Sequence, residues 1–287
     1  MKSKSLLAIL LAGSVIVTGC NNSDEESSVK NSSTEATKDT EVIDLKAEID
    51  AYKEFALDQM DQFTTETEKF VAAVKAGDID KAKNIYPNAR MFFERSEPIA
   101  ESFGDLDPRI DARLADLEEE GQGKEDWSGY HKIEYGLWEE NTTKGYEKTA
   151  DQLLKDAKEL RARVETVEVT PDLMMTGAID LLNEVSTSKI SGEEEIFSHT
   201  DLYDFKANVE GAEKIFTILE SKIEAKDPEL AKNLTEKFKA VNDLLANHET
   251  KDGYISYTEL TKDDTKALAE AVNNLGEPLS QMAIIME

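Results

Sequence analysis

The chain has 287 residues, with 33 Lys or Arg against 61 Asp or Glu, so its formal net charge at pH 7 is -28. A chain of this length can bury a core in one large domain or two smaller ones. Its single cysteine excludes an internal disulfide and a multi-cysteine metal site. The negative charge, without any Lys/Arg-rich stretch, argues against nucleic-acid binding.

The first predicted element is an export signal at residues 1–19. Two lysines precede an apolar run from Leu6 to Val17, which is too short for a resident membrane span. The run ends in Val17-Thr18-Gly19-Cys20, which resembles a bacterial lipobox, in which the cysteine is lipidated and becomes the mature N-terminus. We therefore expect a lipid anchor on Cys20 and a place on the extracytoplasmic face of the cell membrane. An ordinary cleaved signal with an incidental cysteine is the alternative.

Residues 20–41 are predicted to form a lipidated, flexible tether. The stretch from Asn21 to Thr40 is dominated by Ser, Thr, Asn, Asp, Glu and Lys and contains no aromatic residue. Such a segment cannot bury enough apolar area to offset the entropy of ordering the chain. About twenty flexible residues give an end-to-end distance on the order of 25 Å, enough to lift a domain off the lipid headgroups.

From residue 42 to residue 287, apolar residues recur at helical spacing and alternating strand patterns are scarce. One stripe runs from Leu45 to Val74, and Gly77 is expected to end that helix. A capping residue before a proline marks three later helix starts, at Asp107-Pro108, Thr170-Pro171 and Asp227-Pro228. Further helices are predicted near residues 79–86, 88–102, 127–138, 142–168, 172–188, 201–225, 228–247 and 264–285.

These elements predict an all-α fold of long antiparallel helices joined by short loops. The helices form either one elongated bundle or a pair of four-helix bundles. No long linker divides residues 42–287, so we treat them as one helical domain. A seam inside it is expected near Val169–Pro171 or in the stretch from Ser186 to Ser198.

The strongest local signal for chemistry is the run from Trp127 to Trp138. In a helix, Trp127, His131, Glu134 and Trp138 share one face, and the two tryptophans predict that this face is buried. An unpaired charge in an apolar interior is costly, and a metal ion or a counter-charge offsets that cost. The alternative is a His–Glu hydrogen bond that only satisfies itself in the core.

Further acidic groups follow the same logic. Glu94 and Glu97 are three residues apart and therefore lie on one helical face, although a solvated acidic face gives the same pattern. Asp111 alone is an ordinary first-turn acid, because Asp107 is interpreted as the N-cap. Glu194 has capping-box spacing from Ser191.

A cation site inside a helix bundle is built by facing helices that each contribute a pair of inward side chains. One imidazole with several carboxylates is a set of hard to borderline ligands, which suits iron and can also take Zn²⁺, Cu²⁺ or Mn²⁺. Four methionines at helical spacing are interpreted as core residues instead of a copper site: Met174, Met175, Met282 and Met286.

Four motifs in this order resemble the EfeO/EfeM lipoproteins of the imelysin-like superfamily, over roughly residues 45–287. They are the run Val71–Asp78, Glu94-Arg-Ser-Glu97-Pro98 with its continuation to Asp111, Gly129-x-His131-x-x-Glu134, and Ser191-Gly-Glu-Glu followed by Ser198-His-Thr-Asp201. The resemblance implies a component of an Efe- or Fep-type iron-uptake system. Its partners would be a membrane iron permease and a secreted haem peroxidase of the dye-decolorising class.

The resemblance also implies a ligand set for iron, as Fe²⁺ or Fe³⁺. Longer members of the family carry an N-terminal cupredoxin domain, whereas this chain resembles the shorter EfeM form. Leu114 and Ala115 stand where relatives often have acidic residues. The family's proposed metal ligands correspond here to Glu94, Glu97, Asp111, His131 and Glu134, with Glu193, or alternatively Glu194, as an addition.

Two other functions are weighed against iron capture. A metallopeptidase of the helical zinc type needs two histidines in one motif, and Tyr135 stands where the second would be. A metal-independent adhesin or polysaccharide-binding lipoprotein needs exposed aromatic platforms, but only 7% of the residues are aromatic and most fit buried stripes. The sequence therefore favours a non-enzymatic, membrane-anchored lipoprotein that captures iron and delivers it to a permease.

Overall fold

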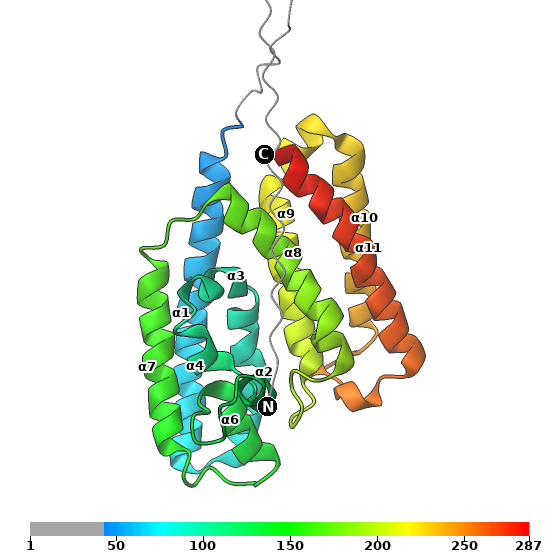
Figure 1. Ribbon diagram of the computed structural model, residues 1–287. Coiled ribbons are helices and arrows are strands. Elements are labelled where there is room, and N and C mark those ends of the chain that lie inside the picture. The colour runs from blue at the N-terminus through cyan, green and yellow to red at the C-terminus, as the bar shows by residue number, and fades with distance from the viewer. Residues whose placement is uncertain (1–42, 287) are drawn as a thin grey trace, which may run out of the picture. The chain divides into compact units, whose positions relative to one another are not determined.

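The computed structural model describes residues 43–286, and almost all of the ordered elements in them are helices (Figure 1). The predicted export signal, Cys20 and the tether lie outside the described residues. In residues 43–286, no helix is long and apolar enough to cross a membrane. The all-α prediction is confirmed.

Four long helices form the N-terminal half of the domain. The first of them packs against the second and the last, and three short helices connect the second to the third (Figure 1). The long helices are α1 (Lys46–Ala76), α2 (Ile79–Glu94), α6 (Gly129–Trp138) and α7 (Glu147–Val164), and the short ones are α3 (Glu97–Ala100), α4 (Asp107–Asp111) and α5 (Leu114–Glu119), with a 3₁₀ turn η1 (Glu101–Phe103).

Four further long helices form the C-terminal half, in which each helix packs mainly on two of the others. Between the third and fourth of them, a two-stranded antiparallel hairpin pairs Glu249 with Tyr254. The helices are α8 (Pro171–Thr187), α9 (Asp201–Lys226), α10 (Pro228–Ala246) and α11 (Lys262–Met286); the smaller elements are η2 (Lys189–Ser191), β1 (Glu249–Thr250), β2 (Gly253–Tyr254) and η3 (Tyr257–Glu259).

Several helix ends follow the local signals in the sequence. Gly77 ends α1 with φ of 76°, in the left-handed region that glycine adopts without steric cost. Thr170 and Asp227 cap α8 and α10, because their side chains accept hydrogen bonds from backbone N–H groups three residues later. The four methionines of α8 and α11 are buried in the core, as expected.

Other boundaries differ from the predictions. A single helix α2 passes through Pro87, where a break was expected between residues 86 and 88. Pro87 cannot donate a backbone hydrogen bond. Burial of the neighbouring Tyr86, Ala89 and Arg90 offsets the loss of that bond, so the helix continues past the proline. Asp107 begins α4 instead of capping it, because its side chain lines an acidic cavity and makes no capping hydrogen bond.

The two halves meet where α2 packs against α9. Asn208 of α9 is fully buried, and its side-chain amide donates a hydrogen bond to the backbone carbonyl of Glu94 at 3.0 Å. One turn further on, a Cβ atom on Gly211 would lie 2.5 Å from the carbonyl oxygen of Arg95. The absence of a side chain at Gly211 therefore permits the close approach that brings the acidic groups of both halves together.

Candidate metal centre

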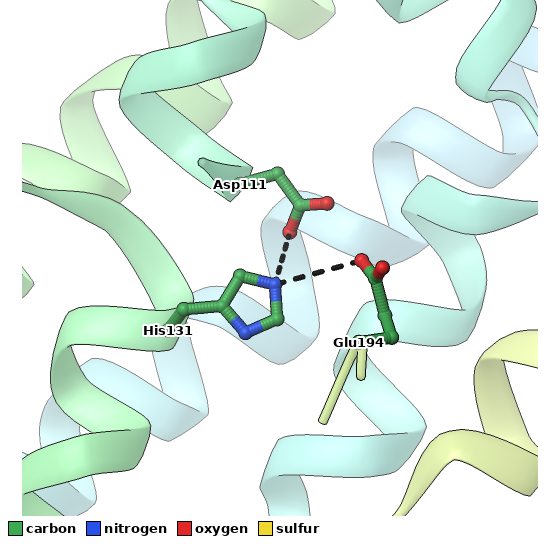
Figure 2. Close-up of side chains that lie close together, drawn as sticks. All are labelled: Asp111, His131 and Glu194. Atoms are coloured by element: carbon green, nitrogen blue, oxygen red, sulfur yellow. Dashed lines mark ion pairs between the residues drawn. The ribbon is translucent and has the colours of Figure 1, made fainter. Parts of the chain in front are cut away.

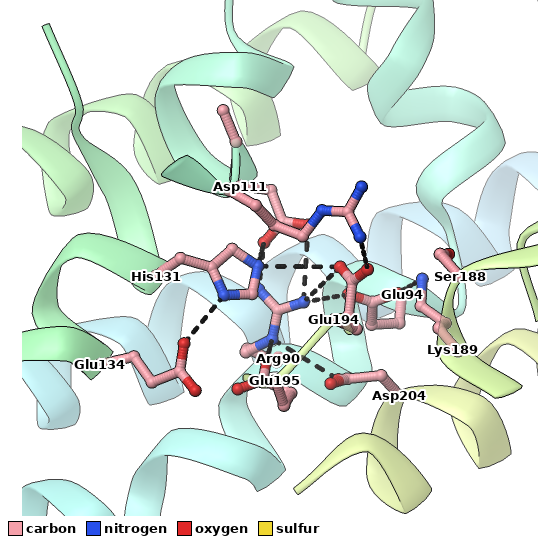
Figure 3. A network of polar contacts seen from close by, with 12 residues as sticks. Arg90, Glu94, Asp111, His131, Glu134, Ser188, Lys189, Glu194, Glu195 and Asp204 are labelled. Carbon is pink, nitrogen blue, oxygen red and sulfur yellow. Dashed lines mark hydrogen bonds and ion pairs between the residues drawn. The ribbon is translucent and has the colours of Figure 1, made fainter. Parts of the chain in front are cut away.

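Buried charged side chains gather where α2, α6 and α9 approach one another (Figure 3). Among the described residues, seven buried carboxylates belong to this cluster, against two buried bases and one imidazole. The acids are Glu94, Glu97, Glu134, Glu194, Glu195, Asp201 and Asp204; the bases are Arg90 and Lys189, and the imidazole is that of His131. Half-buried Asp111 completes the set. Negative charge therefore exceeds positive charge in the interior, which is costly unless protons or cations compensate it.

The start of α6 is held against the end of α4. Gly129 has φ of 81°, and a Cβ atom there would lie 2.2 Å from the carbonyl oxygen of Ile110. Just before it, the indole N–H of Trp127 donates to the carbonyl of Ala112 at 2.7 Å. This contact places His131, in the first turn of α6, beside Asp111 at the end of α4. Trp127 itself precedes the helix, which begins two residues later than the sequence pattern predicts.

His131 faces two carboxylates from different segments (Figure 2). Its Nε2 lies 3.7 Å from Oδ1 of Asp111 and 3.7 Å from Oε1 of Glu194, and it has no hydrogen-bond partner although the side chain is only 2% exposed. A metal ion binds such donors at ~2.0–2.2 Å. The ligand atoms of these three side chains, which we call the triad, lie close enough together to hold one cation, and the Arg90 guanidinium pairs with the same oxygens of Asp111 and Glu194.

Glu134 orients the ring from the opposite side. Its Oε2 lies 3.1 Å from Nδ1 of His131, and its Oε1 accepts the backbone N–H groups of Phe197 and Ser198 at 3.1 and 2.7 Å. A carboxylate behind a histidine in this way fixes the ring and directs the other nitrogen to a metal. Burial raises the pKa of Glu134, but the hydrogen bond and charge of His131 outweigh it and the pKa is lowered. Glu134 is therefore ionised at neutral pH.

Arg90 occupies the middle of the cluster, and the sequence analysis missed it. Its Nη2 lies 2.6 Å from Glu94 and its Nε 2.5 Å from Glu195, and the guanidinium also pairs with Asp111 and, at 3.5 Å, with Asp204. The side chain is 1% exposed. The available signal was its position on the buried face of α2, on the same stripe as Tyr86 and Phe93. Arg90 neutralises part of the acidic charge.

The ammonium group of Lys189 lies beside the predicted pair Glu94 and Glu97 and supplies a positive charge there. Lys189 Nζ lies 2.7 Å from Glu94, 3.0 Å from Glu184 and 3.7 Å from Glu97, and is 1% exposed. The amide of Asn208 also donates to both glutamates of the pair, at 3.1 Å each. Glu94 and Glu97 thus lie next to the triad but are already engaged by a base and an amide.

The loop between η2 and α9 distributes its three glutamates in different directions. Glu193 is exposed to solvent, Glu194 reaches the triad, and Glu195 is fully buried. The expected capping box is wrong: the Ser191 hydroxyl donates to the carbonyl of Ser188, and no helix begins there. The reason is that the chain turns through a left-handed conformation at the glycine after Ser191 and then runs through turns at residues 194–198 before α9 begins.

The triad holds a proton when no cation is bound. Burial and Arg90 lower the pKa of His131, but the hydrogen bond to Glu134 and the nearby Glu194 and Asp111 outweigh them and raise it to about 10. Burial raises the pKa of Glu194, yet Lys189, His131 and Arg90 prevail and the pKa is lowered. A metal ion at Nε2 therefore replaces a proton and meets a Glu194 carboxylate that is already ionised.

A solvent-accessible cavity of about 220 Å³ leads to the triad between α4, α5 and α8. Its wall includes Asp111 and Glu194, together with further acids and a single base, Arg113. The Arg113 guanidinium binds Asp116 at 2.7 and 2.9 Å and approaches Glu194 at 3.5 Å. We call this space the acidic cavity. Its surface potential attracts cations toward the triad. The other acids in its wall are Glu97, Glu101, Asp107, Asp116, Glu120 and Glu184.

A family model described as imelysin matches residues 48–282. The chain belongs to the imelysin-like EfeM/EfeO family. A lipoprotein of Staphylococcus haemolyticus named as an EfeM/EfeO family member is 51% identical over 290 residues, covering 99% of this chain and 100% of the relative. Lipoproteins of the same name from Staphylococcus aureus strains NCTC 8325 and COL are 54% identical over 246 residues, covering 85% of this chain and 86% of each relative.

Proposed function

We propose that this EfeM/EfeO-family protein is an extracytoplasmic, membrane-anchored iron-binding lipoprotein that captures iron and delivers it to a permease of the Efe or Fep type. The observation that carries the proposal is the buried His131 Nε2, without a hydrogen-bond partner and facing Asp111 and Glu194. The names of the relatives support the lipoprotein part.

The donor set fits iron as cargo. Two carboxylates and one imidazole are hard to borderline ligands, and three protein ligands on one side leave open positions, as in many non-haem iron sites. Glu134 behind His131 supplies the orienting contact that such sites use. Zn²⁺ or Cu²⁺ would bind the same set and serve as surrogates.

Capture and release follow from the charges around the triad. An incoming cation takes Asp111 from Arg90, takes Glu194 from its weaker contacts with Arg90 and Arg113, and displaces the proton of His131. Because a proton competes for the same nitrogen, acidification favours release. Docking on a permease that moves α4 or the loop before α9 would separate the ligands and have the same effect.

Among the described residues, one histidine belongs to the cluster, and His199 and His248 stand outside it. Helical zinc peptidases of the His-Glu-x-x-His type use two histidines of one motif. No observation favours a hydrolytic site over a binding site here, so the proposed role is non-enzymatic.

The test is iron binding by the protein and by two matched variants. His131→Asn removes the metal-binding nitrogen at similar size, whereas His199→Asn changes a histidine outside the cluster at φ of 57°, a conformation that asparagine tolerates. We expect His131→Asn to lose iron binding in anaerobic Fe²⁺ titrations and His199→Asn to retain it. Equal binding by both variants would refute the site, and anomalous diffraction at the iron edge would locate the ion.

The anchor and the partners need separate measurements. Cys20→Ala should release the protein from cells into the medium if the lipid anchor is attached there. Transfer of radioactive iron from the loaded protein to cells should require the permease gene, and a secreted dye-decolorising peroxidase is the proposed supplier of iron. Uptake that is unchanged without this protein would exclude the delivery role.

A further inference from the structure

A second cavity next to the acidic cavity also reaches the triad, and its exposed wall is mainly hydrocarbon. It has a volume of about 200 Å³, and Leu114, Trp127, Ile196 and Phe197 line it, with His131 and Glu194 at its inner end. We call it the apolar cavity. The rings of Trp127 and Phe197 lie 6.4 Å apart between centroids, and Ile196 is 53% exposed at the rim.

The two cavities share Arg113 and Glu194, and Asp111 lines the acidic cavity whereas His131 lines the apolar one, so the triad is reached from two chemically different spaces. A hydrated cation is favoured by the acidic cavity, because carboxylates replace its water. A hydrated cation gains less from aromatic and aliphatic walls, because the burial of such walls is favoured mainly by contact with another apolar surface. The apolar cavity therefore suits an organic group that accompanies the ion.

We propose that the apolar cavity receives the aromatic ring of a chelator that stays bound to the captured ion, in a complex of Fe³⁺ with a vicinal aromatic diol. This inference rests on the proposed function, because the ion in the complex is held by the triad of Asp111, His131 and Glu194. The ring would lie between Trp127 and Ile196, with its two oxygens on the metal.

Coordination number and charge support this ligand class. The triad supplies three donors, so an octahedral ion keeps open positions that a bidentate oxygen chelator fills in part. A one-to-one complex of Fe³⁺ with a doubly deprotonated diol has a net charge of +1, which the surplus of buried carboxylates attracts. A vicinal aromatic diol joins two hard donors directly to a flat apolar ring, which matches a cavity with donors at one end and hydrocarbon on its walls.

Size restricts the choice further. Pockets for drug-sized ligands have volumes of ~300–1,000 Å³, whereas this cavity has about 200 Å³. It accommodates a single ring and excludes a porphyrin. Citrate is a less suitable companion, because it has no apolar face and because the two outer glutamates of the wall, Glu118 and Glu193, outnumber its single arginine, Arg113.

The experiment compares two iron complexes on the purified full-length mature protein. Fe³⁺ is presented with one equivalent of catechol or with citrate, and native mass spectrometry measures whether the protein gains the ion alone or the ion with the chelator. We expect a species of one protein, one iron and one catechol, and tighter binding of the catechol complex than of the citrate complex in competition titrations.

Substitutions of exposed isoleucines distinguish binding in the apolar cavity from non-specific adsorption of the complex to hydrophobic surface. Ile196→Ser should weaken binding of the catechol complex about fivefold, from the loss of apolar contact, and should leave anaerobic Fe²⁺ binding unchanged. Ile284→Ser is the matched control: Ile284 is 69% exposed on α11, outside both cavities. It should change neither measurement.

The outcomes distinguish this inference from the proposed function. If Fe²⁺ binds at the triad but the catechol complex loads only its metal, or if Ile196→Ser has no effect on the complex, the aromatic chelate is excluded and the iron-binding role stands. If the protein binds neither Fe²⁺ nor any Fe³⁺ complex, the proposed function fails together with this inference.

Discussion

The clearest energetic test of the cluster is replacement of Arg90 by methionine, which has similar length and no charge. In the structure the guanidinium is 1% exposed and pairs with carboxylates from α2, α4, α9 and the loop before α9. Arg90→Met leaves these acids buried without their main counter-charge. The expected loss of folding stability therefore comes more from the uncompensated buried charge than from the energy of any single ion pair.

The size of the effect follows from that geometry. Removing one partner of a buried ion pair costs ~3–5 kcal/mol, whereas an exposed pair contributes ~1 kcal/mol or less. For a domain of ~150–250 residues, each kcal/mol changes the melting temperature by ~2–4 °C. We expect Arg90→Met to lower the melting temperature of the metal-free protein by roughly 10 °C at pH 7. The difference in melting temperature from the parent should be smaller at pH 5, because the buried carboxylates that have lost Arg90 then take up protons.

The assay is thermal unfolding followed by circular dichroism, in chelator-treated buffer and then with added Zn²⁺. Arg163→Met is the control, because Arg163 is 34% exposed and pairs with Asp105 and Glu159 on the surface. A cation in the triad should restore more stability to Arg90→Met than to the parent protein, since it supplies the missing positive charge. Equal melting temperatures of Arg90→Met and the parent at pH 7 would refute this account of the cluster.

Three further predictions concern the triad. Glu134→Gln should weaken Zn²⁺ affinity ~10- to 100-fold with little change in helix content, because the orienting charge behind His131 is lost; isothermal titration measures it, and unchanged affinity would contradict the positioning role. Below the His131 pKa of about 10, Zn²⁺ must displace one proton, so affinity should rise about tenfold per pH unit between pH 6 and 8; titrations in buffers of different ionisation heat count that proton, and a flat profile would oppose it. Gly129→Ala should destabilise the fold and abolish binding, because the new Cβ would collide with the Ile110 carbonyl and push α6 away from Asp111; a stable variant that binds Zn²⁺ normally would show that this contact is dispensable.

The features that could be predicted from the sequence are those that depend on residues adjacent along the chain. The helical class, the end of α1 at Gly77 and the caps at Thr170 and Asp227 each follow from a short pattern with one dominant physical cause. The expected break at Pro87 failed for the opposite reason, because packing against the other helices outweighs a local hydrogen-bond deficit. The His131 and Glu134 spacing correctly indicated a buried pair on α6.

The part of the site that sequence reasoning missed depends on contacts between residues far apart in the chain. Glu94 is one helical turn from Arg90, but Asp111 is 21 residues from it and Lys189 is 95 residues from Glu94, so no spacing rule connects those pairs. The choice between Glu193 and Glu194 depends on the course of one loop. From the sequence we also expected buried acids around a bound cation. The structure instead places two basic side chains, Arg90 and Lys189, among these acids. Which acids remain for a metal follows only from these distances.

The three triad residues come from different stretches of chain, with Asp111 and His131 in the N-terminal half and Glu194 on the loop that leads into α9. No isolated hairpin or helix pair contains the complete set of donors. A newly made chain consequently does not assemble the triad until its two halves have docked. On the proposed function, loading with iron would thus be a late event in the maturation of each molecule, and a chain that stalls half-folded would stay empty.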